Sequence, residues 1–568
     1  MTDSRASLHP TPAWVLACQQ EDGGFGAFPG DISALRPTAW ALDALRALGV
    51  PGPRFEDVAS FILSQQNEDG GFRGRPWGLR WTERSGLVDS YHAVRALQAL
   101  GRDIPRAREL AEFVRSRQRA DGAFLQDLYP EKAGTCADTF YAASILTALG
   151  ADVPRRADAI AFLRRMQAEN VRRDGGFIAE DTPEWVELIQ AAREWAASVD
   201  PYRSPGPDQT RAIPVAVGFT RATDLAMRAL AVLGDWPPDV PGAAAFLCGQ
   251  QHESGGFLSG MGDYGAYQDR SEGRMVDTYH AVSGLRRLAS MGGDGSQTED
   301  EAWPRFLSSG RIDVAQCAAW IAACQNPDGG FAHRPDPLSR PSDMTATAQA
   351  VLTLTALGRP LPTPADGRAP EREELPKGAK FELSSPFFQP DQPGQALYLH
   401  RIVAPIRAAC GSDEATALSL MRWLHRHMVF HQNSRNEAAL IIEDGLGACG
   451  PQARCLAGLL QATGIRARFL MLVGHGTCEG YIAGRWCLLD AVFNGAFRGP
   501  DGRLYSALDA HEQHRLGRPE ITTFGDWRYE SYAIYEPKGG AEYHEFAIAA
   551  GDTAASPSAR AAYPELSG

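Results

Sequence analysis

Lysine is almost missing from this chain of 568 residues. Only Lys132, Lys377, Lys380 and Lys538 occur, and each falls in a segment predicted as a loop. A catalytic amine is activated by burial among apolar or cationic neighbours, which such loops do not offer. Schiff-base catalysis is therefore not expected, and arginine carries nearly all of the positive charge.

Net positive charge and long apolar runs are also lacking. The formal net charge of −13 argues against nucleic acid and anionic membranes as partners, because phosphate binding needs clustered positive charge. No apolar run approaches the length of a membrane span, and the N-terminal MTDSRASLHPTPAW has no secretory apolar region. We expect a cytoplasmic protein, and the abundance of arginine, alanine and glycine is typical of a GC-rich bacterial source.

The ten cysteines lack the repeated spacing of a disulfide framework, so reduced thiols are expected. No metal and no other cofactor is predicted. Cys449 nevertheless stands out, because it follows a glycine-rich turn and opens a run, 452–463, whose apolar residues recur at helical spacing. Its sulfur should lie at a helix N-terminus, where the helix dipole favours the thiolate.

Two further residues complete an ordered set after Cys449. His475 begins a stretch of loosely alternating apolar residues, and Asp490 ends another that starts at Trp486. Both stretches are predicted as neighbouring antiparallel strands facing the helix. In such a set the imidazole serves as base and acid for the thiol, and the carboxylate fixes the imidazole tautomer. An isolated cysteine or histidine is more often a packing residue, so the ordered set carries the argument.

These residues resemble the transglutaminase-like superfamily. The matching elements are Gly447-Ala448-Cys449, the strand Gly464-Ile465-Arg466-Ala467-Arg468, His475, and the strand from Trp486 to Asp490. The resemblance implies an α+β, papain-like domain with Cys449, His475 and Asp490 as catalytic residues. Many relatives have an aromatic residue and a proline where this chain has Thr477 and Ala491, so the substrate class stays open.

The first two thirds of the chain consist of repeats. Segments such as QEDGGF and NPDGGF end at Phe25, Phe72, Phe124, Phe177, Phe257 and Phe331, at spacings of about 47 to 53 residues with two intervals of about 75 to 80. Each repeat predicts a helix, a glycine turn and a second helix, for example 58–66 and 88–100. Both helices are strongly apolar, so neighbouring hairpins must bury them, and six hairpins could close into a ring.

The repeats resemble the α/α toroid of protein prenyltransferase β subunits and of squalene and other terpenoid cyclases, over residues 10–358. The resemblance implies that the N-termini of the second helices line a central cavity. The expected lining residues are Thr38, Asp89, Tyr91, His92, Asp138, Tyr141, Asp224, Asp277, Tyr279, His280 and Asp343. Aspartates at helix starts are also ordinary capping residues, and that interpretation stays open for each of them.

Two enzymatic motifs of toroid proteins are incomplete here. Zinc prenyltransferases use an Asp-x-Cys element, and in Asp89-Ser90-Tyr91 a tyrosine takes the cysteine position. Class II terpenoid cyclases use an Asp-x-Asp-Asp-Thr acid, and the closest segment, 135–139, keeps only Asp138 of the three carboxylates. Neither chemistry is supported by its motif.

The sequence thus predicts a multidomain protein: an all-α toroid over 10–358, a proline-rich linker over 359–395, an α+β transglutaminase-like domain over 396–538 and a flexible tail over 539–568. The predicted function is thiol-dependent acyl transfer to an amine or water, with the toroid binding a small-molecule, peptide or carrier-protein-bound acyl substrate. The alternatives are isoprenoid chemistry in the toroid with an accessory C-terminal domain, and a non-catalytic binding scaffold. The oligomeric state is not predicted.

Overall fold

The computed structural model describes residues 9–50, 55–74, 84–126, 134–170, 173–179, 218–260, 271–291, 298–335, 341–364, 366–374, 393–430, 438–472, 475–492, 494–499, 501–507, 509 and 522–524. For a few of these, His475 among them, the description is limited to the backbone. Residues 375–392 of the predicted linker and the predicted tail, 539–568, lie outside the described residues. The chain divides into two compact units, one consisting of Met1–Val186, Val215–Gly262 and Arg270–Glu374, the other of the remaining residues.

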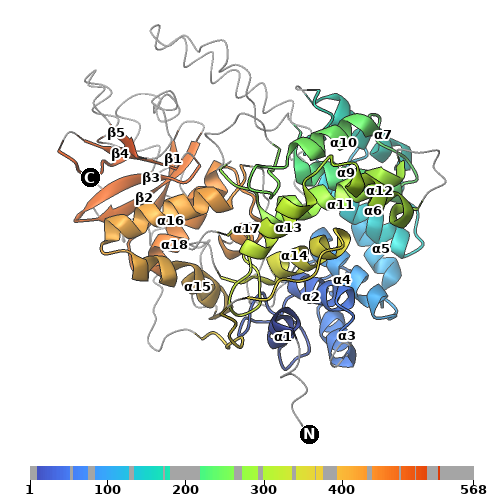
Figure 1. Ribbon diagram of the computed structural model, residues 1–568, viewed down its shortest axis with the longest axis horizontal. Coiled ribbons are helices and arrows are strands. Elements are labelled where there is room, and N and C mark those ends of the chain that lie inside the picture. The colour runs from blue at the N-terminus through green and yellow to red at the C-terminus, as the bar shows by residue number, and fades with distance from the viewer. Residues whose placement is uncertain are drawn as a thin grey trace. The chain divides into compact units, whose positions relative to one another are not determined.

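The first unit is a closed ring of helices. Its inner helices are α2 (Leu35–Ala47), α4 (Leu87–Ala99), α6 (Cys136–Ala148), α9 (Thr220–Val232), α11 (Met275–Met291) and α14 (Met344–Ala356). Each packs against the next in this order, and α14 packs against α2, which closes the ring (Figure 1). The outer helices are α1 (Pro10–Ala17), α3 (Phe55–Ser64), α5 (Ala107–Arg115), α7 (Arg156–Ala168), α10 (Val240–Gly249), α12 (Glu299–Ser308) and α13 (Val314–Ala323). The predicted α/α toroid is confirmed, with helix ends one to three residues from those expected.

The glycine turn that follows each outer helix packs against the start of the next outer helix. Gly122 has a φ of 89°, and a Cβ on it would lie 2.2 Å from the carbonyl carbon of Asp158, at the start of α7. Only glycine tolerates both this conformation and this approach. The first glycine of the other Asp-Gly-Gly and Ser-Gly-Gly turns makes the equivalent contact, and Gly329 of the last repeat makes it with Pro10 of α1. The turn motif therefore sets the spacing between neighbouring outer helices.

A hydroxyl group on each inner helix holds the phenylalanine of its repeat. The backbone N–H of that phenylalanine donates to a threonine or serine Oγ near the helix start. The pairs are Phe25 with Thr38 (3.0 Å), Phe72 with Ser90 (3.0 Å), Phe124 with Thr139 (3.1 Å), Phe177 with Thr223 (2.9 Å), Phe257 with Thr278 (3.0 Å) and Phe331 with Thr347 (2.9 Å). Thr38, predicted as a cavity residue, thus has an architectural role that every repeat shares.

Helix α1 joins the first repeat to the last. Thr11 Oγ1 donates to the carbonyl of Gly329 at 2.9 Å, and Trp14 Nε1 donates to Asp328 Oδ2 at 3.1 Å. Gln325 Nε2 in turn donates to Thr11 Oγ1 at 3.1 Å. Residues more than 300 positions apart therefore complete the ring by the contacts that link successive repeats.

The second unit is an α+β domain. Its helices are α15 (Pro393–Ala409), α16 (Asp413–His427), α17 (Ala438–Asp444) and α18 (Cys449–Ala462), and its strands are β1 (Ala467–Leu472), β2 (His475–Ile482), β3 (Arg485–Asp490), β4 (Gly495–Arg498) and β5 (Thr522–Phe524). The strands form one antiparallel sheet in the order β1-β2-β3-β4-β5. The helix and the two neighbouring antiparallel strands predicted around Cys449, His475 and Asp490 are confirmed as α18, β2 and β3. Helix α18 packs mainly against β2 and β1, so the expectation that both predicted strands face the helix holds for β2.

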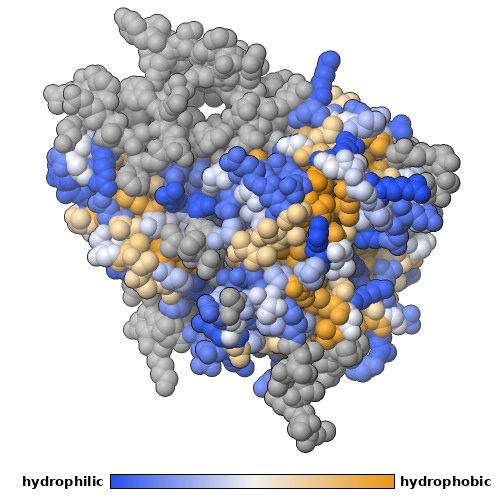
Figure 2. All heavy atoms as spheres, viewed as in Figure 1, coloured by the Kyte–Doolittle hydropathy of each residue, from blue (hydrophilic) through white to orange (hydrophobic). Residues whose placement is uncertain are grey.

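The surface of the described residues is mostly polar. On the face shown in Figure 2, apolar side chains appear in separate patches between hydrophilic ones. Among the described residues, Trp236 is the exposed large hydrophobic side chain, with an exposed fraction of 54%. No helix among them is long and apolar enough to cross a membrane.

Candidate functional site

Cys449 is the first residue of α18, at a helix start without a side-chain cap. The N-cap residue is Ala448, whose methyl group cannot accept a hydrogen bond. Pro451 in the first turn has no N–H group, and the N–H of Gln452 already donates to the carbonyl of Ala448 at 3.0 Å. The backbone N–H groups of Cys449 and Gly450 lie at the positive end of α18.

The turn before Cys449 is held from two sides. The N–H of Val429 donates to the carbonyl of Gly445 at 2.9 Å, and the N–H of Gly447 donates to the carbonyl of Val429 at 3.0 Å. From the other side, Gln452 Nε2 donates to the carbonyl of Gly447 at 2.7 Å. A Cβ on Gly447 would lie 2.9 Å from Met428 Cε, so the glycine also allows this close packing. These contacts fix the direction in which the chain enters α18.

Cys449 differs from the other cysteines around it. It is half-buried, whereas Cys455, Cys478 and Cys487 are fully buried. Burial raises the pKa of Cys487 to about 12, and raises the pKa of Cys455 and of Cys478 further still. These three thiols stay protonated at neutral pH and serve as small packing residues.

The backbone brings the start of β2 against the start of α18. A Cβ on Gly476, the residue after His475, would lie 2.9 Å from the Cα of Gly450, the residue after Cys449. In the β2–β3 register Cys478 lies opposite Leu489, and Thr477 Oγ1 donates to the carbonyl of Leu489 at 3.2 Å. Continuing that register by one residue places Asp490 opposite Thr477, on the face that His475 shares by strand alternation. The three predicted residues therefore come from adjoining backbone positions.

Asp490 is buried, with an exposed fraction of 2%, at the end of β3. Its Oδ1 accepts a hydrogen bond from the N–H of Val492 at 2.8 Å. On α16, the buried His425 has Nδ1 at 3.0 Å from the carbonyl oxygen of Ala491 and at 3.1 Å from that of Val492. His425 was not predicted, because its only signal in the sequence is an apolar helix face and its partners follow 66 and 67 residues later.

The arginine of the Gly-Ile-x-x-Arg strand has a structural partner. Arg468 Nε donates to Glu479 Oε2 at 2.8 Å, and its guanidinium lies 4.1 Å from the ring centroid of Trp486. Glu479 Oε1 accepts from the N–H of Ala507 at 2.8 Å. This buried pair ties β1, β2 and β3 together, and it explains two of the motif's residues by packing.

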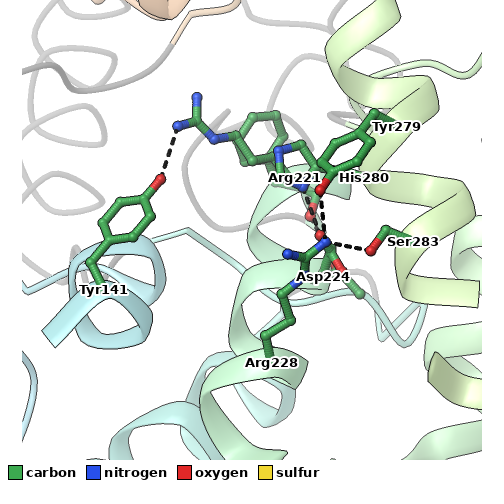
Figure 3. Close-up of polar contacts among 9 residues, drawn as sticks. Tyr141, Arg221, Asp224, Arg228, Tyr279, His280 and Ser283 are labelled. Atoms are coloured by element: carbon green, nitrogen blue, oxygen red, sulfur yellow. Dashed lines mark hydrogen bonds and ion pairs between the residues drawn. The ribbon is translucent and has the colours of Figure 1, made fainter. Parts of the chain in front are cut away.

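The toroid contains a second polar cluster, formed by residues from α9 and α11 (Figure 3). His280 Nδ1 lies 2.7 Å from Asp224 Oδ2, and Arg228 Nε donates to Asp224 Oδ1 at 3.0 Å. Arg228 also bonds to Ser283 and, at 3.4 Å, to the hydroxyl of Tyr279. Burial lowers the pKa of His280 to about 4, so its ring is neutral at neutral pH and Nδ1–H donates to Asp224. Burial alone would raise the pKa of Asp224, but Arg228 and His280 outweigh it and lower that pKa.

Side chains from α2, α4 and α6 extend this cluster across the ring. Arg95 Nη2 lies 2.8 Å from Asp43 Oδ2, and its guanidinium lies 5.0 Å from the ring centroid of Trp40 and 5.5 Å from that of Tyr91. Trp40 on α2 contacts Tyr279 on α11, two helices that are not neighbours in the ring, at 5.5 Å between centroids. At this depth the interior of the ring thus presents aromatic and ionised side chains, two of which meet across it.

The predicted toroid residues thus divide into two groups. Tyr91 contacts Tyr141 at 5.0 Å between centroids, and His92 contacts Trp40 at 6.0 Å, so these join Asp224, Tyr279 and His280 in the interior. Burial, together with Arg95, Arg36 and Arg221, lowers the pKa of His92 well below its ordinary value. Trp40, Asp43, Arg95 and Arg228 complete the cluster and were not predicted. Asp43, Arg95 and Arg228 lie about one turn further along their helices than the predicted residues, and Trp40 lies two residues after Thr38.

The remaining predicted aspartates have local partners. Asp343 caps α14 by accepting from the N–H groups of Thr345 at 2.8 Å and Ala346 at 3.2 Å. Asp138 Oδ2 accepts from the N–H of Gln126 at 3.1 Å. Asp89 lies against Gly74, where a Cβ would be 2.5 Å from its Oδ1, and Asp277 lies 3.6 Å from Arg274. Asp224 departs from the expected position, because α9 begins at Thr220 and the aspartate falls in its second turn.

No group of three His, Cys, Asp or Glu side chains with metal-binding geometry occurs within the described ranges. At the tyrosine that replaces the zinc-ligand cysteine, Tyr91, the ring packs edge-on against Phe140 at 5.2 Å between centroids. Aromatic packing thus takes the place of a thiolate at this helix start.

Comparisons with known families agree with this architecture. The model of the prenyltransferase alpha-alpha toroid domain matches residues 3–56, 34–184 and 222–360, together more than half of the chain. The model of the transglutaminase-like superfamily matches residues 400–491, the segment that contains Cys449, His475 and Asp490. No curated protein matches the chain in sequence.

Solved structures show distant similarity. A protein geranylgeranyltransferase-I from Candida albicans, complexed with GGPP, is 14% identical over 57% of this chain and 83% of that chain, with a TM-score of 0.39. A type II terpene cyclase from Scytonema, in complex with geranylgeranyl dihydroxybenzoate, is 14% identical over 61% of this chain and 95% of that chain, also with a TM-score of 0.39. The family matches and the closed helical ring lead to one assignment: the chain belongs to the prenyltransferase α/α toroid family, and its second unit is a transglutaminase-like domain.

Proposed function

We propose that the transglutaminase-like domain catalyses thiol-dependent acyl transfer, with Cys449 as nucleophile, His475 as base and acid, and Asp490 as the residue that orients His475. The observation that carries the proposal is the contact between Gly476 and Gly450. It sets the residue before each glycine, His475 and Cys449, at adjoining ends of a strand and a helix. The register of β2 and β3 adds Asp490 on the same strand face.

The reaction proceeds in two steps. The Cys449 thiolate attacks the carbonyl carbon of an amide or thioester, and the N–H groups of Cys449 and Gly450 stabilise the negative oxygen that forms. His475 gives its proton to the departing amine or thiol, which leaves an acyl-thioenzyme. An amine or water then attacks that thioester with His475 as base, and the Cys449 thiolate is released.

In this proposal Gln452 holds the backbone before Cys449 and does not contact the substrate. Its Nε2 donates to the carbonyl of Gly447 and is used there to hold the turn before the nucleophile. We therefore assign oxyanion stabilisation to the backbone N–H groups of the α18 start, which has no side-chain cap.

The toroid acts as the substrate-recognition domain in this proposal. Its interior presents the aromatic rings of Trp40, Tyr91 and Tyr279. The guanidinium groups of Arg95 and Arg228 lie over these rings. Such a surface suits a substrate with polar or charged groups better than a purely apolar chain. The substrate is a small molecule, a peptide or an acyl group bound to a carrier protein.

Isoprenoid chemistry in the toroid is the second candidate, and membership of the toroid family favours it. Against it stand Tyr91 in place of a zinc-ligand cysteine and Asp138 as the lone carboxylate of its segment. The ion pairs of the interior add to this, because Arg95 with Asp43 and Arg228 with Asp224 make a polar surface that suits a long apolar chain poorly. A non-catalytic scaffold remains the third candidate.

The decisive experiment uses the full chain and p-nitrophenyl acetate. We expect a burst of p-nitrophenol and a mass increase of one acetyl group on the peptide that contains Cys449. Cys449→Ala should abolish both, whereas Cys410→Ala, which removes another half-buried thiol of the same unit, should leave both unchanged. Acetylation that persists in Cys449→Ala would overturn the proposal, and product formed by that variant from geranylgeranyl diphosphate would promote the second candidate.

A further inference from the structure

His425 on α16 has a specific contact with the turn that follows Asp490. Its exposed fraction is 8%, and Nδ1 lies 3.0 Å from the carbonyl oxygen of Ala491 and 3.1 Å from that of Val492. A carbonyl oxygen can only accept, so Nδ1 carries the hydrogen and shares it between the two carbonyls. Ala491 and Val492 are themselves buried, at 3% and 1% exposed, so their carbonyls depend on a protein donor.

One peptide unit connects His425 to the carboxylate of Asp490. The carbonyl of Ala491, which accepts from His425, belongs to the same peptide group as the N–H of Val492. That N–H donates to Asp490 Oδ1 at 2.8 Å. The chain of contacts therefore runs from the imidazole N–H through the Ala491–Val492 peptide to the carboxylate. A hydrogen bond to a carbonyl polarises the N–H of the same peptide, so the two bonds strengthen each other.

We propose that His425 is a positioning residue for Asp490, acting through the Ala491–Val492 peptide. The inference rests on the proposed function, because it assigns Asp490 to orient His475. Holding the peptide plane fixes the direction of the Val492 N–H, and with it the rotation of the carboxylate about its side-chain bonds. The imidazole is well placed for this task, because it projects from a helix whose neighbouring residues are packed in the core, among them Met421 and Leu424, both fully buried.

Helix α16 provides a matched control in His427. This residue also bonds to a backbone carbonyl, with Nε2 at 2.6 Å from the oxygen of Ile442, and it stacks on Trp423 at 4.8 Å between centroids. Its partner lies on α17 and not in the turn after Asp490. The two histidines therefore make the same type of contact. The contact of His425 leads through the Ala491–Val492 peptide to the Asp490 carboxylate, whereas that of His427 leads to α17.

The test measures acetylation of Cys449 in the full chain by p-nitrophenyl acetate, across pH 5 to 9. We expect His425→Leu, which removes the donor, to slow acetylation by about 10- to 100-fold and to shift the pH profile. His425→Asn, whose amide can donate near the position of Nδ1, should recover to within about threefold of the unmodified rate. His427→Leu should lower the melting temperature at most and leave the pH profile unchanged.

A double-mutant cycle with Asp490→Asn separates positioning from general stability. If His425 acts through Asp490, His425→Leu should slow acetylation much less in the Asp490→Asn protein than in the native one. The same fold-loss in both backgrounds, or a native rate and pH profile in His425→Leu, would overturn the inference. Should His425→Leu not fold, the same cycle with His425→Asn and His425→Gln decides, since only the shorter amide can donate near Nδ1. Loss of acetylation in Cys449→Ala keeps the proposed function standing whatever the cycle shows.

Discussion

The toroid and the transglutaminase-like domain differ in the residues that lie near their helix starts. In the toroid, a threonine or serine near each inner-helix start is occupied by the N–H of a phenylalanine, and this contact occurs in every repeat. At the start of α18, the N-cap is Ala448, which provides no side-chain cap, and Gly447 precedes it while Gly450 follows Cys449. A contact repeated in every unit therefore reports architecture. The missing cap alone is not distinctive, because α2, α4 and α9 also begin without a side-chain cap. The start of α18 differs in having a half-buried cysteine as its first residue, next to the start of β2.

The buried charges follow the same division. Inside the ring, Arg228 pairs with Asp224 and Arg95 pairs with Asp43, so each of these charges has an opposite charge beside it. The thiol of Cys449, by contrast, is half-buried at a positive helix end, beside a strand that begins with a histidine. Each prediction below changes one side of this comparison and leaves the other intact.

The largest effect is expected from Cys449→Ala. Acyl transfer should fall by at least about 10⁴-fold, because the nucleophile is lost and members of a triad act as a unit. The fold of both units should be retained, as measured by circular dichroism. The control is Cys410→Ala, and a comparable loss of activity in that variant would show that the assay reports stability instead of chemistry.

In the toroid, Gly122→Ala should destabilise the protein by about 4 kcal/mol. The new Cβ would lie 2.2 Å from the backbone of Asp158, at a φ of 89° that side chains rarely adopt. Gly150→Ala is the matched control, because its φ of 65° is also positive but a Cβ there has no neighbour within 4 Å. Its cost should be only about 1 kcal/mol. Equal losses in urea unfolding would mean that strain, and not helix spacing, explains the turn glycines.

The pH dependence of the toroid should report the neutral state of His280. Burial lowers its pKa from 6.5 to about 4, so the unfolded chain binds a proton more readily and stability should fall as pH drops from 6.5 towards 4. The contribution is about 3 kcal/mol over this window. The His280→Asn variant keeps a hydrogen-bond donor for Asp224 but has no titrating ring. Between pH 6.5 and 4 its free energy of unfolding should therefore fall by about 3 kcal/mol less than that of the native protein.

Other titrating groups near His280 are present in both the native protein and the His280→Asn variant. The lowered pKa of His92 also makes the protein less stable as the pH falls. Burial raises the pKa of Asp43 and of Asp277, and these two shifts make the protein more stable as the pH falls. Burial alone would lower the pKa of Arg228, but Asp224 outweighs it and raises that pKa well above its ordinary value, so Arg228 stays charged. Only the difference between the two unfolding curves tests His280, and parallel curves between pH 6.5 and 4 would contradict the assignment of a neutral ring.

The smallest effect is expected from Gly476→Ala. A Cβ there would lie 2.9 Å from the Cα of Gly450, which should push β2 away from the start of α18 by a fraction of an ångström. Acetylation of Cys449 should slow by about 10- to 100-fold with little change in melting temperature. Gly411→Ala, where a Cβ has no neighbour within 4 Å, should leave the rate unchanged. An unaltered rate in Gly476→Ala would separate Cys449 from His475.

Much of the fold could be predicted from the sequence, because its signals are local. The repeated glycine turns predicted the helical hairpins. A strand was predicted to begin at His475 and another to run from Trp486 to Asp490, and β2 begins at His475 while β3 spans Arg485–Asp490. The interior of the ring could not be predicted in the same way. Trp40, Arg95 and Arg228 come from different repeats, and their contacts depend on the rotation of each helix about its axis.

The candidate site shows the same limit. The order of Cys449, His475 and Asp490 along the chain is a sequence property, but the contact between Gly476 and Gly450 depends on how α18 lies on the sheet. His425 could not be recognised in advance, because nothing local marks a helix residue whose partners are carbonyls beyond β3. Motifs therefore located the reacting groups, and only the packing showed what holds them.

The most direct test of the central claim is the relative rate at which iodoacetamide modifies each thiol of the native protein. Cys449, Cys410 and Cys248 are all half-buried, so accessibility alone would give them similar rates. Burial raises the pKa of Cys248, and Cys455 and Cys478 are buried and protonated. Peptide mass spectrometry over time should show Cys449 modified at least about tenfold faster than any other cysteine at pH 7. Equal rates for Cys449 and Cys410 would contradict the account, because the helix start and His475 would then have no effect on the thiol.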